Sequence, residues 1–165
     1  MNYFSEIENL IRINEINKRV RTLQDNRETL YTYWHVGKII VESQNESKKT
    51  NNLIKELGKR LSLKYGKEFS ASYFSKMRLF YLTFPILESL IPKLSWTHYM
   101  ELLTIKNPNE RNFYINKVIL NNLSVRDLKK EIKNKTFDTL PYTDKEHVKL
   151  IDEAYDVPTS INDIK

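Results

Sequence analysis

Apolar residues recur at the three- and four-residue spacing of helices along most of the chain. The longest such stripe covers residues 5–46 and predicts one long helix, or two nearly collinear ones. Glycine inside a helix costs about 1 kcal/mol relative to alanine, so Gly37 indicates either a kink or the close approach of another helix. The apolar positions of the stripe are Ile16, Val20, Leu23, Leu30, Trp34 and Val41.

Two shorter helices are predicted next, joined by a short turn. Residues 51–65 form the first, and Gly66 follows where a glycine commonly ends a helix. The second begins near Ser70, a good N-cap residue, and ends before Pro85. Its predicted inward face consists of five aromatic side chains and one methionine: Tyr73, Phe74, Met77, Phe80, Tyr81 and Phe84.

Three more helices are predicted to begin at N-cap residues. Ser95 opens a helix to about residue 104, Asn107 followed by a proline opens one to about 121, and Ser124 opens one to about 133. Residues 145–155 are compatible with one more short helix. Strand signals are missing, because no period-two alternation or hairpin turn occurs. The sequence therefore predicts an all-α fold, a bundle of about six helices.

Whole-chain composition limits the class of protein. The 165 residues fit one domain plus a tail, and we predict a helical domain over 1–135 followed by an acidic tail over 136–165. No apolar run approaches the ~18 residues needed to span a bilayer, and the N-terminus does not resemble a signal peptide. Cysteine is absent, which suits a reducing compartment. We expect a cytoplasmic protein without a membrane partner.

The net charge of +6 is unevenly distributed. Residues 48–78 carry nine basic and two acidic side chains, whereas residues 138–165 carry three basic and seven acidic ones. A local surplus of this kind is typical of a surface that binds a polyanion. The alternative is a solvated face, because the chain is also rich in Asn and Ile, a coding bias that inflates lysine throughout.

The basic stretch coincides with the helix pair over residues 51–84, which has the layout of a helix-turn-helix. A helical wheel centred on Met77 turns the aromatic side chains inward and the two serines of the second helix outward. Like charges four residues apart destabilise a helix by roughly 0.2–0.5 kcal/mol, so folding did not require lysines at 55 and 59. The predicted DNA-binding residues are Lys55, Lys59, Lys67, Ser72, Ser75, Lys76 and Arg78.

No catalytic motif is evident in the sequence, and we expect no enzymatic activity, no metal, no cofactor and no small-molecule substrate. Glu131 and Lys133 with Asp127 are the closest approach to a metal-dependent nuclease motif, but they fall in a predicted helix, where residues two apart diverge. The three histidines lack partners at metal-ligand spacing, and His35 and His98, which stand beside tryptophans, are predicted to be packed or partly buried. A different class of function is a protein–protein interaction or homo-oligomer formed by the long N-terminal helix. Its pairing stripe would be Ile16, Val20, Leu23, Leu30 and Trp34.

Four motifs in order resemble a known family over about residues 30–133. They are YWHVGKII at 33–40, LGKRLSLKYGKEFSASYFSKMRLFY at 57–81, LSWTHYMELL at 94–103 and ERNFYINKVILNNLSVRDLKKEI at 110–132. This pattern resembles the N-terminal domain of YhcG-type proteins (domain of unknown function 1016), which precedes a predicted nuclease domain of the PD-(D/E)xK class. Departures are Leu123, where the family usually has tryptophan, and Tyr73-Phe74 in place of Asn-Leu.

The resemblance implies a helical accessory domain that binds nucleic acid or assembles with a partner. In the family the nuclease domain lies C-terminal to this region, and residues 159–165 resemble the lead-in to it. Residues 136–165 are therefore interpreted as an acidic tail or as the lead-in to a C-terminal nuclease domain.

Overall fold

Seven α-helices make up most of the structure, a computed structural model that describes residues 2–46 and 50–155. No strand occurs in these two ranges, so the predicted all-α fold is confirmed. The helices are α1 Tyr3–Glu46, α2 Thr50–Tyr65, α3 Ala71–Thr83, α4 Trp96–Leu102, α5 Pro108–Asn121, α6 Val125–Lys133 and α7 Tyr142–Lys145. Short 3-10 turns cover Leu87–Ser89 (η1), Thr136–Thr139 (η2) and Asp152–Tyr155 (η3).

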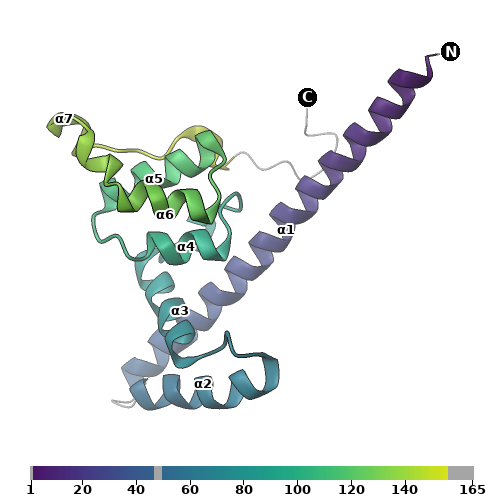
Figure 1. Cartoon of the computed structure of the whole chain (residues 1–165). Coiled ribbons are helices and arrows are strands. Elements are labelled where there is room, and N and C mark those ends of the chain that lie inside the picture. Colours follow the sequence, from purple (N-terminus) through teal and green to yellow (C-terminus); the bar gives the residue numbers. More distant parts are fainter. Residues whose placement is uncertain (1, 47–49, 156–165) are drawn as a thin grey trace.

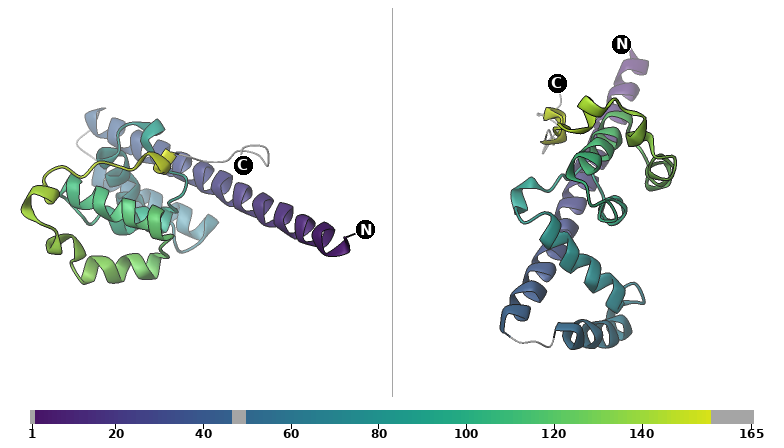
Figure 2. Two further views of the ribbon diagram at one scale, coloured as in Figure 1. Left: turned by 90° about the horizontal axis from the view of Figure 1, so that it is seen from above. Right: turned by 90° about the vertical axis from the view of Figure 1, so that its left-hand side faces the viewer.

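Helix α1 is one continuous helix of 44 residues that crosses the whole molecule. The other elements lie to one side of it, and its first turns extend beyond them (Figures 1 and 2). Its predicted stripe is buried, with exposed fractions of 5% at Ile16, 8% at Val20 and 1% at Leu30. The prediction that this stripe pairs with another protomer is wrong, because those side chains already belong to the interior of their own chain.

The crossing of α1 and α3 depends on Gly37. A Cβ atom at this position would lie 2.1 Å from the main-chain oxygen of Met77, in the middle of α3. Beside the crossing, Trp34 Nε1 donates a hydrogen bond of 2.7 Å to the main-chain oxygen of Phe84. The predicted close approach of another helix at Gly37 is confirmed, and α1 shows no interruption of its helix there.

Helices α2 and α3 meet at a second glycine. A Cβ atom at Gly58 would lie 2.5 Å from the main-chain nitrogen of Ala71, at the start of α3. Gly66 ends α2 with a φ of 128°, a conformation that other residues rarely adopt. Ser70 then caps α3 by accepting a hydrogen bond from the main-chain nitrogen of Tyr73. The contact at Gly58, the turn at Gly66 and the cap at Ser70 together fix how α2 and α3 lie against each other.

Stacked aromatic rings join this pair to the rest of the body. Phe80 of α3 stacks on Trp96 and on Tyr99 of α4, with ring centroids 5.1 and 5.0 Å apart. Phe80 and Tyr99 are fully buried. Large planar side chains of this kind contribute much of the stability of a small core.

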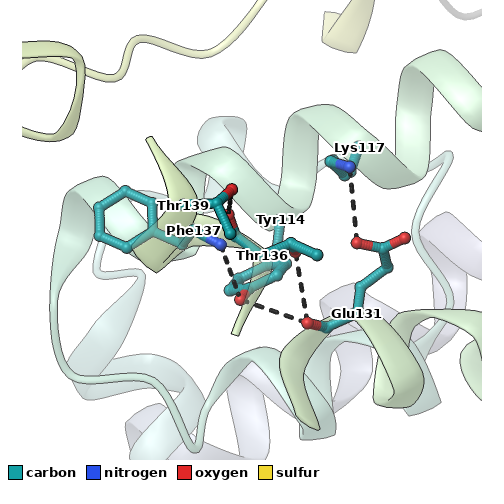
Figure 3. Close-up of polar contacts among 6 residues, drawn as sticks. All are labelled: Tyr114, Lys117, Glu131, Thr136, Phe137 and Thr139. Atoms are coloured by element: carbon teal, nitrogen blue, oxygen red, sulfur yellow. Dashed lines mark hydrogen bonds and ion pairs between the residues drawn. The ribbon is translucent and has the colours of Figure 1, made fainter. Parts of the chain in front are cut away.

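The C-terminal half is a layer of α4, α5 and α6 closed by the turn η2. Tyr114 of α5 accepts a hydrogen bond from the main-chain nitrogen of Phe137, and Thr136 Oγ1 donates one of 3.3 Å to the main-chain oxygen of Glu131 (Figure 3). The Glu131 side chain also pairs with Lys117 Nζ at 3.5 Å. These contacts fold the chain back over α5 after α6 ends.

Residues beyond 135 continue to pack against the body. Phe137 is buried, with 4% of its surface exposed, and so is Ala154. The helix predicted over 145–155 is wrong: α7 ends at Lys145 with Glu146 as its C-cap, residues 147–151 have no regular secondary structure, and η3 is a 3-10 turn. The domain boundary at residue 135 stays a prediction, and residues 156–165 of the predicted tail lie outside the described residues.

Candidate nucleic-acid interface

The candidate interface is the outward surface of α2, α3 and the turn between them, at the opposite end of the molecule from α7 (Figure 1). Helix α1 packs on the inner side of α3, through Gly37 and Met77. The outward side of α3 therefore remains open to solvent.

The first turns of α3 present polar side chains on this side. Ser72 and Ser75 are both exposed and Lys76 is half-buried, whereas Phe74 and Met77 face the core. This is the division that the helical wheel predicts. Hydroxyl and ammonium groups can donate hydrogen bonds to phosphate oxygens and base edges, and residues early in the second helix of a helix-turn-helix are the ones that reach bases.

Arg78 is placed less favourably than its charge suggests. Its side chain is half-buried, and its Nε is buried without a hydrogen-bond partner in the part of the chain that the structure describes. Part of the guanidinium is thus withdrawn from solvent, which leaves less of it available to a ligand than in a fully exposed arginine.

Three exposed lysines lie on α2 and in the turn that follows it. Lys55 and Lys59 lie on α2 on either side of Gly58, the point of contact with α3, and Lys67 lies in the turn. The neighbouring Arg60 is different, because its Nε lies 2.6 Å from Glu56 Oε1 and its charge is partly neutralised. The structure thus leaves five of the seven predicted residues exposed on this helix pair, and Lys76 and Arg78 are half-buried.

The same face of α3 turns apolar toward the C-terminal end, which sequence reasoning missed. Leu79 and Leu82 are 39% and 46% exposed, and Ile86 in the following loop is 60% exposed. Ser75, Leu79 and Leu82 follow each other at four- and three-residue spacing, the signal that places them on one face. A ligand that covers the whole of α3 would contact a polar half and an apolar half.

Tyr73 lies behind the serines in a ring cluster with Tyr33 and Trp96. The Tyr33 and Tyr73 centroids are 5.7 Å apart, and the Tyr33 and Trp96 centroids are 4.9 Å apart. Burial raises the pKa of Tyr73 well above its usual value of 10.0, and the neighbouring Tyr33 hydroxyl raises it further. The phenol therefore remains neutral at physiological pH, and this cluster supports α3 without contributing charge.

A second surface that sequence reasoning missed lies at the start of α1. Five large apolar side chains there are between 58% and 74% exposed: Tyr3, Phe4, Ile7, Leu10 and Ile11. At 100° per residue, their mean direction differs by roughly 170° from that of the buried stripe. However α1 is rotated about its axis, the rest of the protein could not cover these five residues and the buried stripe at once. We call these five residues the N-terminal apolar stripe.

Among the described residues, no three His, Cys, Asp or Glu side chains lie close enough together to hold a metal ion. No helix in the described ranges combines the length and apolar composition that a bilayer crossing needs. A cleft of about 540 Å³ beside α1 and α5 is lined by Arg19, Asn26, Lys93 and Asn122 among others, without a nucleophile beside a general base.

Comparison with known proteins decides the family. Residues 7–139 match the DUF1016 N-terminal domain. The chain belongs to this family. It is similar to the protein named "Putative nuclease YhcG" of Escherichia coli (strain K12), with 30% identity over 143 residues. That match covers 65% of this chain and only 38% of the relative, so this DUF1016 chain spans well under half of the relative's length. No solved structure matches the chain significantly.

Proposed function

We propose that this DUF1016 domain is a non-catalytic accessory domain that binds duplex DNA through the outward surface of α2, α3 and their turn. The observation that carries the proposal is the exposure of Ser72 and Ser75 beside exposed lysines of α2 and of the turn. A nuclease-named relative that extends beyond this domain supports nucleic acid as the polyanion. The compartment that the proposal implies is the cytoplasm.

Helix-turn-helix docking would place the first turns of α3 in the major groove, with α2 across the backbone. Lys55, Lys59 and Lys67 then bind phosphates, and Ser72, Ser75 and Lys76 reach toward base edges or the sugar–phosphate chain. Arg78 would contribute least, because part of its guanidinium is withdrawn from solvent. Non-specific affinity of this kind is mostly electrostatic.

A matched pair of charge reversals tests the location. Lys59→Glu with Lys67→Glu changes the proposed surface, and Lys106→Glu with Lys149→Glu changes two exposed lysines elsewhere by the same charge. Fluorescence anisotropy with a 20-base-pair duplex at about 50 mM salt should show at least tenfold weaker binding for the first variant. Equal losses for both variants would mean that only net charge matters, and the α2–α3 surface would be abandoned.

A second candidate function is association with a protein, favoured by the N-terminal apolar stripe. Contiguous exposed apolar side chains are typical of interaction surfaces, and these lie on turns of α1 that extend past the body (Figures 1 and 2). Light scattering at about 100 µM tests the homo-oligomeric form. A dimer mass that Ile7→Ser with Leu10→Ser converts to a monomer mass would support it, and a monomer mass for the unmodified chain would remove it.

A further inference from the structure

Three asparagines share one face of α5. Asn109, Asn112 and Asn116 are three and four residues apart, which places them within about 60° of each other around the helix. We call them the asparagine track. The segment of residues 146–151, which we call the strap, has no helix or 3-10 turn and runs along α5 between α7 and η3 (Figure 1).

Asn109 and Asn116 each bind the strap twice. The Nδ2 of Asn109 donates to the main-chain oxygen of Glu146 at 3.0 Å, and its Oδ1 accepts from the main-chain nitrogen of Val148 at 3.2 Å. The Nδ2 of Asn116 donates at 2.8 Å to the main-chain oxygen of residue 149, and its Oδ1 accepts at 3.1 Å from the main-chain nitrogen of Ile151.

Asn112 completes the track between these two. Its Nδ2 donates a hydrogen bond of 3.0 Å to the main-chain oxygen of Val148. All five hydrogen bonds between the track and the strap therefore end on main-chain atoms of the strap. A side-chain amide offers the donor and acceptor of a peptide group, so the track acts as the edge of a neighbouring β-strand would.

Recognition of this kind does not depend on the side chains of the bound segment. Those of Glu146, His147 and Lys149 are exposed, and only Val148, Leu150 and Ile151 add apolar contact with the core. Asparagine is also one of the weaker helix formers, because its side chain competes for main-chain hydrogen bonds. Three asparagines on one face of this 14-residue helix do not favour the helix itself, whereas all three hydrogen-bond the strap.

We propose that the asparagine track is a docking site for an extended polypeptide segment, recognised through its main chain, and that the strap is its resident and detachable ligand. The detachable unit is the strap itself, because Ala154 in η3 is fully buried and holds the chain to the body after residue 151. Detachment opens α5 to an extended segment of another polypeptide. The proposal does not rest on DNA binding, because α5 lies outside the α2–α3 surface.

Hydrogen exchange of the full chain tests the contacts. Asn109→Ala with Asn116→Ala should speed exchange of the Val148 and Ile151 amides at least tenfold, with the core amide of Leu128 unchanged. Asn121→Ala is the matched control, an exposed asparagine of α5 without a hydrogen bond to the strap among the described residues. Alanine favours the helix, so α5 itself is retained. Unchanged exchange at residues 148 and 151 would overturn the proposal.

Binding in trans tests whether the site accepts a separate segment. Leu150→Asp with Ile151→Asp in the full chain should lift the strap, and a labelled peptide of residues 142–155 should then bind saturably. Alanine at peptide positions 146, 147 and 149 should change the affinity less than twofold, whereas N-methylation of the nitrogens at 148 and 151 should weaken it at least tenfold. If the first variant does not fold, as judged by the absence of amides protected from exchange, Val148→Pro is a second way to separate the strap from α5. Absence of binding to a folded lifted variant, or equal binding of the N-methylated peptide, would overturn the proposal.

Discussion

Two residues without side chains determine how closely the main helices pack. Gly37 sits where α1 crosses α3, and Gly58 where α2 reaches the start of α3; in both cases a Cβ atom would meet a main-chain atom at 2.5 Å or less. The sequence pointed to Gly37, because glycine is costly inside a helix. It could not name the partner, since Met77 is distant in the chain and its main-chain oxygen carries no sequence signal.

We therefore expect Gly37→Ala to lower the free energy of unfolding, although alanine in place of a helical glycine usually raises it. At an open helical site alanine would stabilise by about 1 kcal/mol, but here the added methyl group meets the oxygen of Met77, and overpacking of this kind costs about 1–3 kcal/mol. Urea unfolding measures the difference. Asn14→Ala, at an exposed position of α1, is the control and should be neutral or slightly stabilising. A stabilised Gly37→Ala variant would show that the crossing is looser than described.

Tyr73 gives a prediction about alkaline pH. Because its pKa is raised in the folded state above 10.0, the folded chain holds this proton more tightly than the unfolded chain. Its contribution to stability is complete below pH 10 and is lost as the pH rises above that value. Tyr73→Phe should lose less stability than the unmodified chain between pH 9.5 and 11, measured by urea unfolding. Parallel losses would assign the alkaline sensitivity to other groups.

At the scale of elements, N-caps made most helix starts predictable. Ser70, Ser95, Asn107 and Ser124 each accept a hydrogen bond from a main-chain nitrogen of the helix they begin, as expected for residues of these types. The helix predicted over 145–155 was wrong for a physical reason. Side chains on α5 hydrogen-bond main-chain atoms of residues 146, 148, 149 and 151, which offsets the hydrogen bonds that a helix would supply there.

His98 connects elements in a way that its position in the sequence did not reveal. Its Nδ1 accepts a hydrogen bond of 3.2 Å from the main-chain nitrogen of Ser95, and its Nε2 donates one of 2.9 Å to the main-chain oxygen of Leu123. It thereby caps α4 and fixes α4 to the turn before α6. This role depends on a contact 25 residues away.

His98→Ala should destabilise the fold by about 1–3 kcal/mol, because a half-buried main-chain oxygen and a helix cap both lose their partner. His147→Ala, an exposed histidine in the strap, should change stability by less than about 0.5 kcal/mol. Thermal or urea unfolding compares the two. Equal effects would contradict the structural role assigned to His98.

At the scale of the molecule, the sequence predicted the fold class and the outward direction of the serines, but not which apolar surfaces remain exposed. The stripe from Ile16 to Trp34 was expected to bind a partner and is instead buried. The N-terminal apolar stripe lies on nearly the opposite side of α1. Periodicity identifies both as apolar faces, and only the position of the body relative to α1 decides which one is covered.

Charge placement is the basis of the central claim. Lys55 and Lys59 lie on α2, Lys67 lies in the turn, and Lys76 lies on α3, the helix that also carries Ser72 and Ser75. If they neutralise phosphates, each contact releases a counterion, and the logarithm of the binding constant falls with the logarithm of salt concentration by about 0.9 per contact.

The most direct test is this salt slope on duplex DNA, for the unmodified chain and for a variant with alanine at all four lysines. The account predicts binding that weakens by roughly 10²-fold between 50 and 200 mM salt, for about four phosphate contacts, and a slope close to zero for the variant. An unmodified chain that does not bind at 50 mM salt would contradict it, and so would a variant that keeps the original slope.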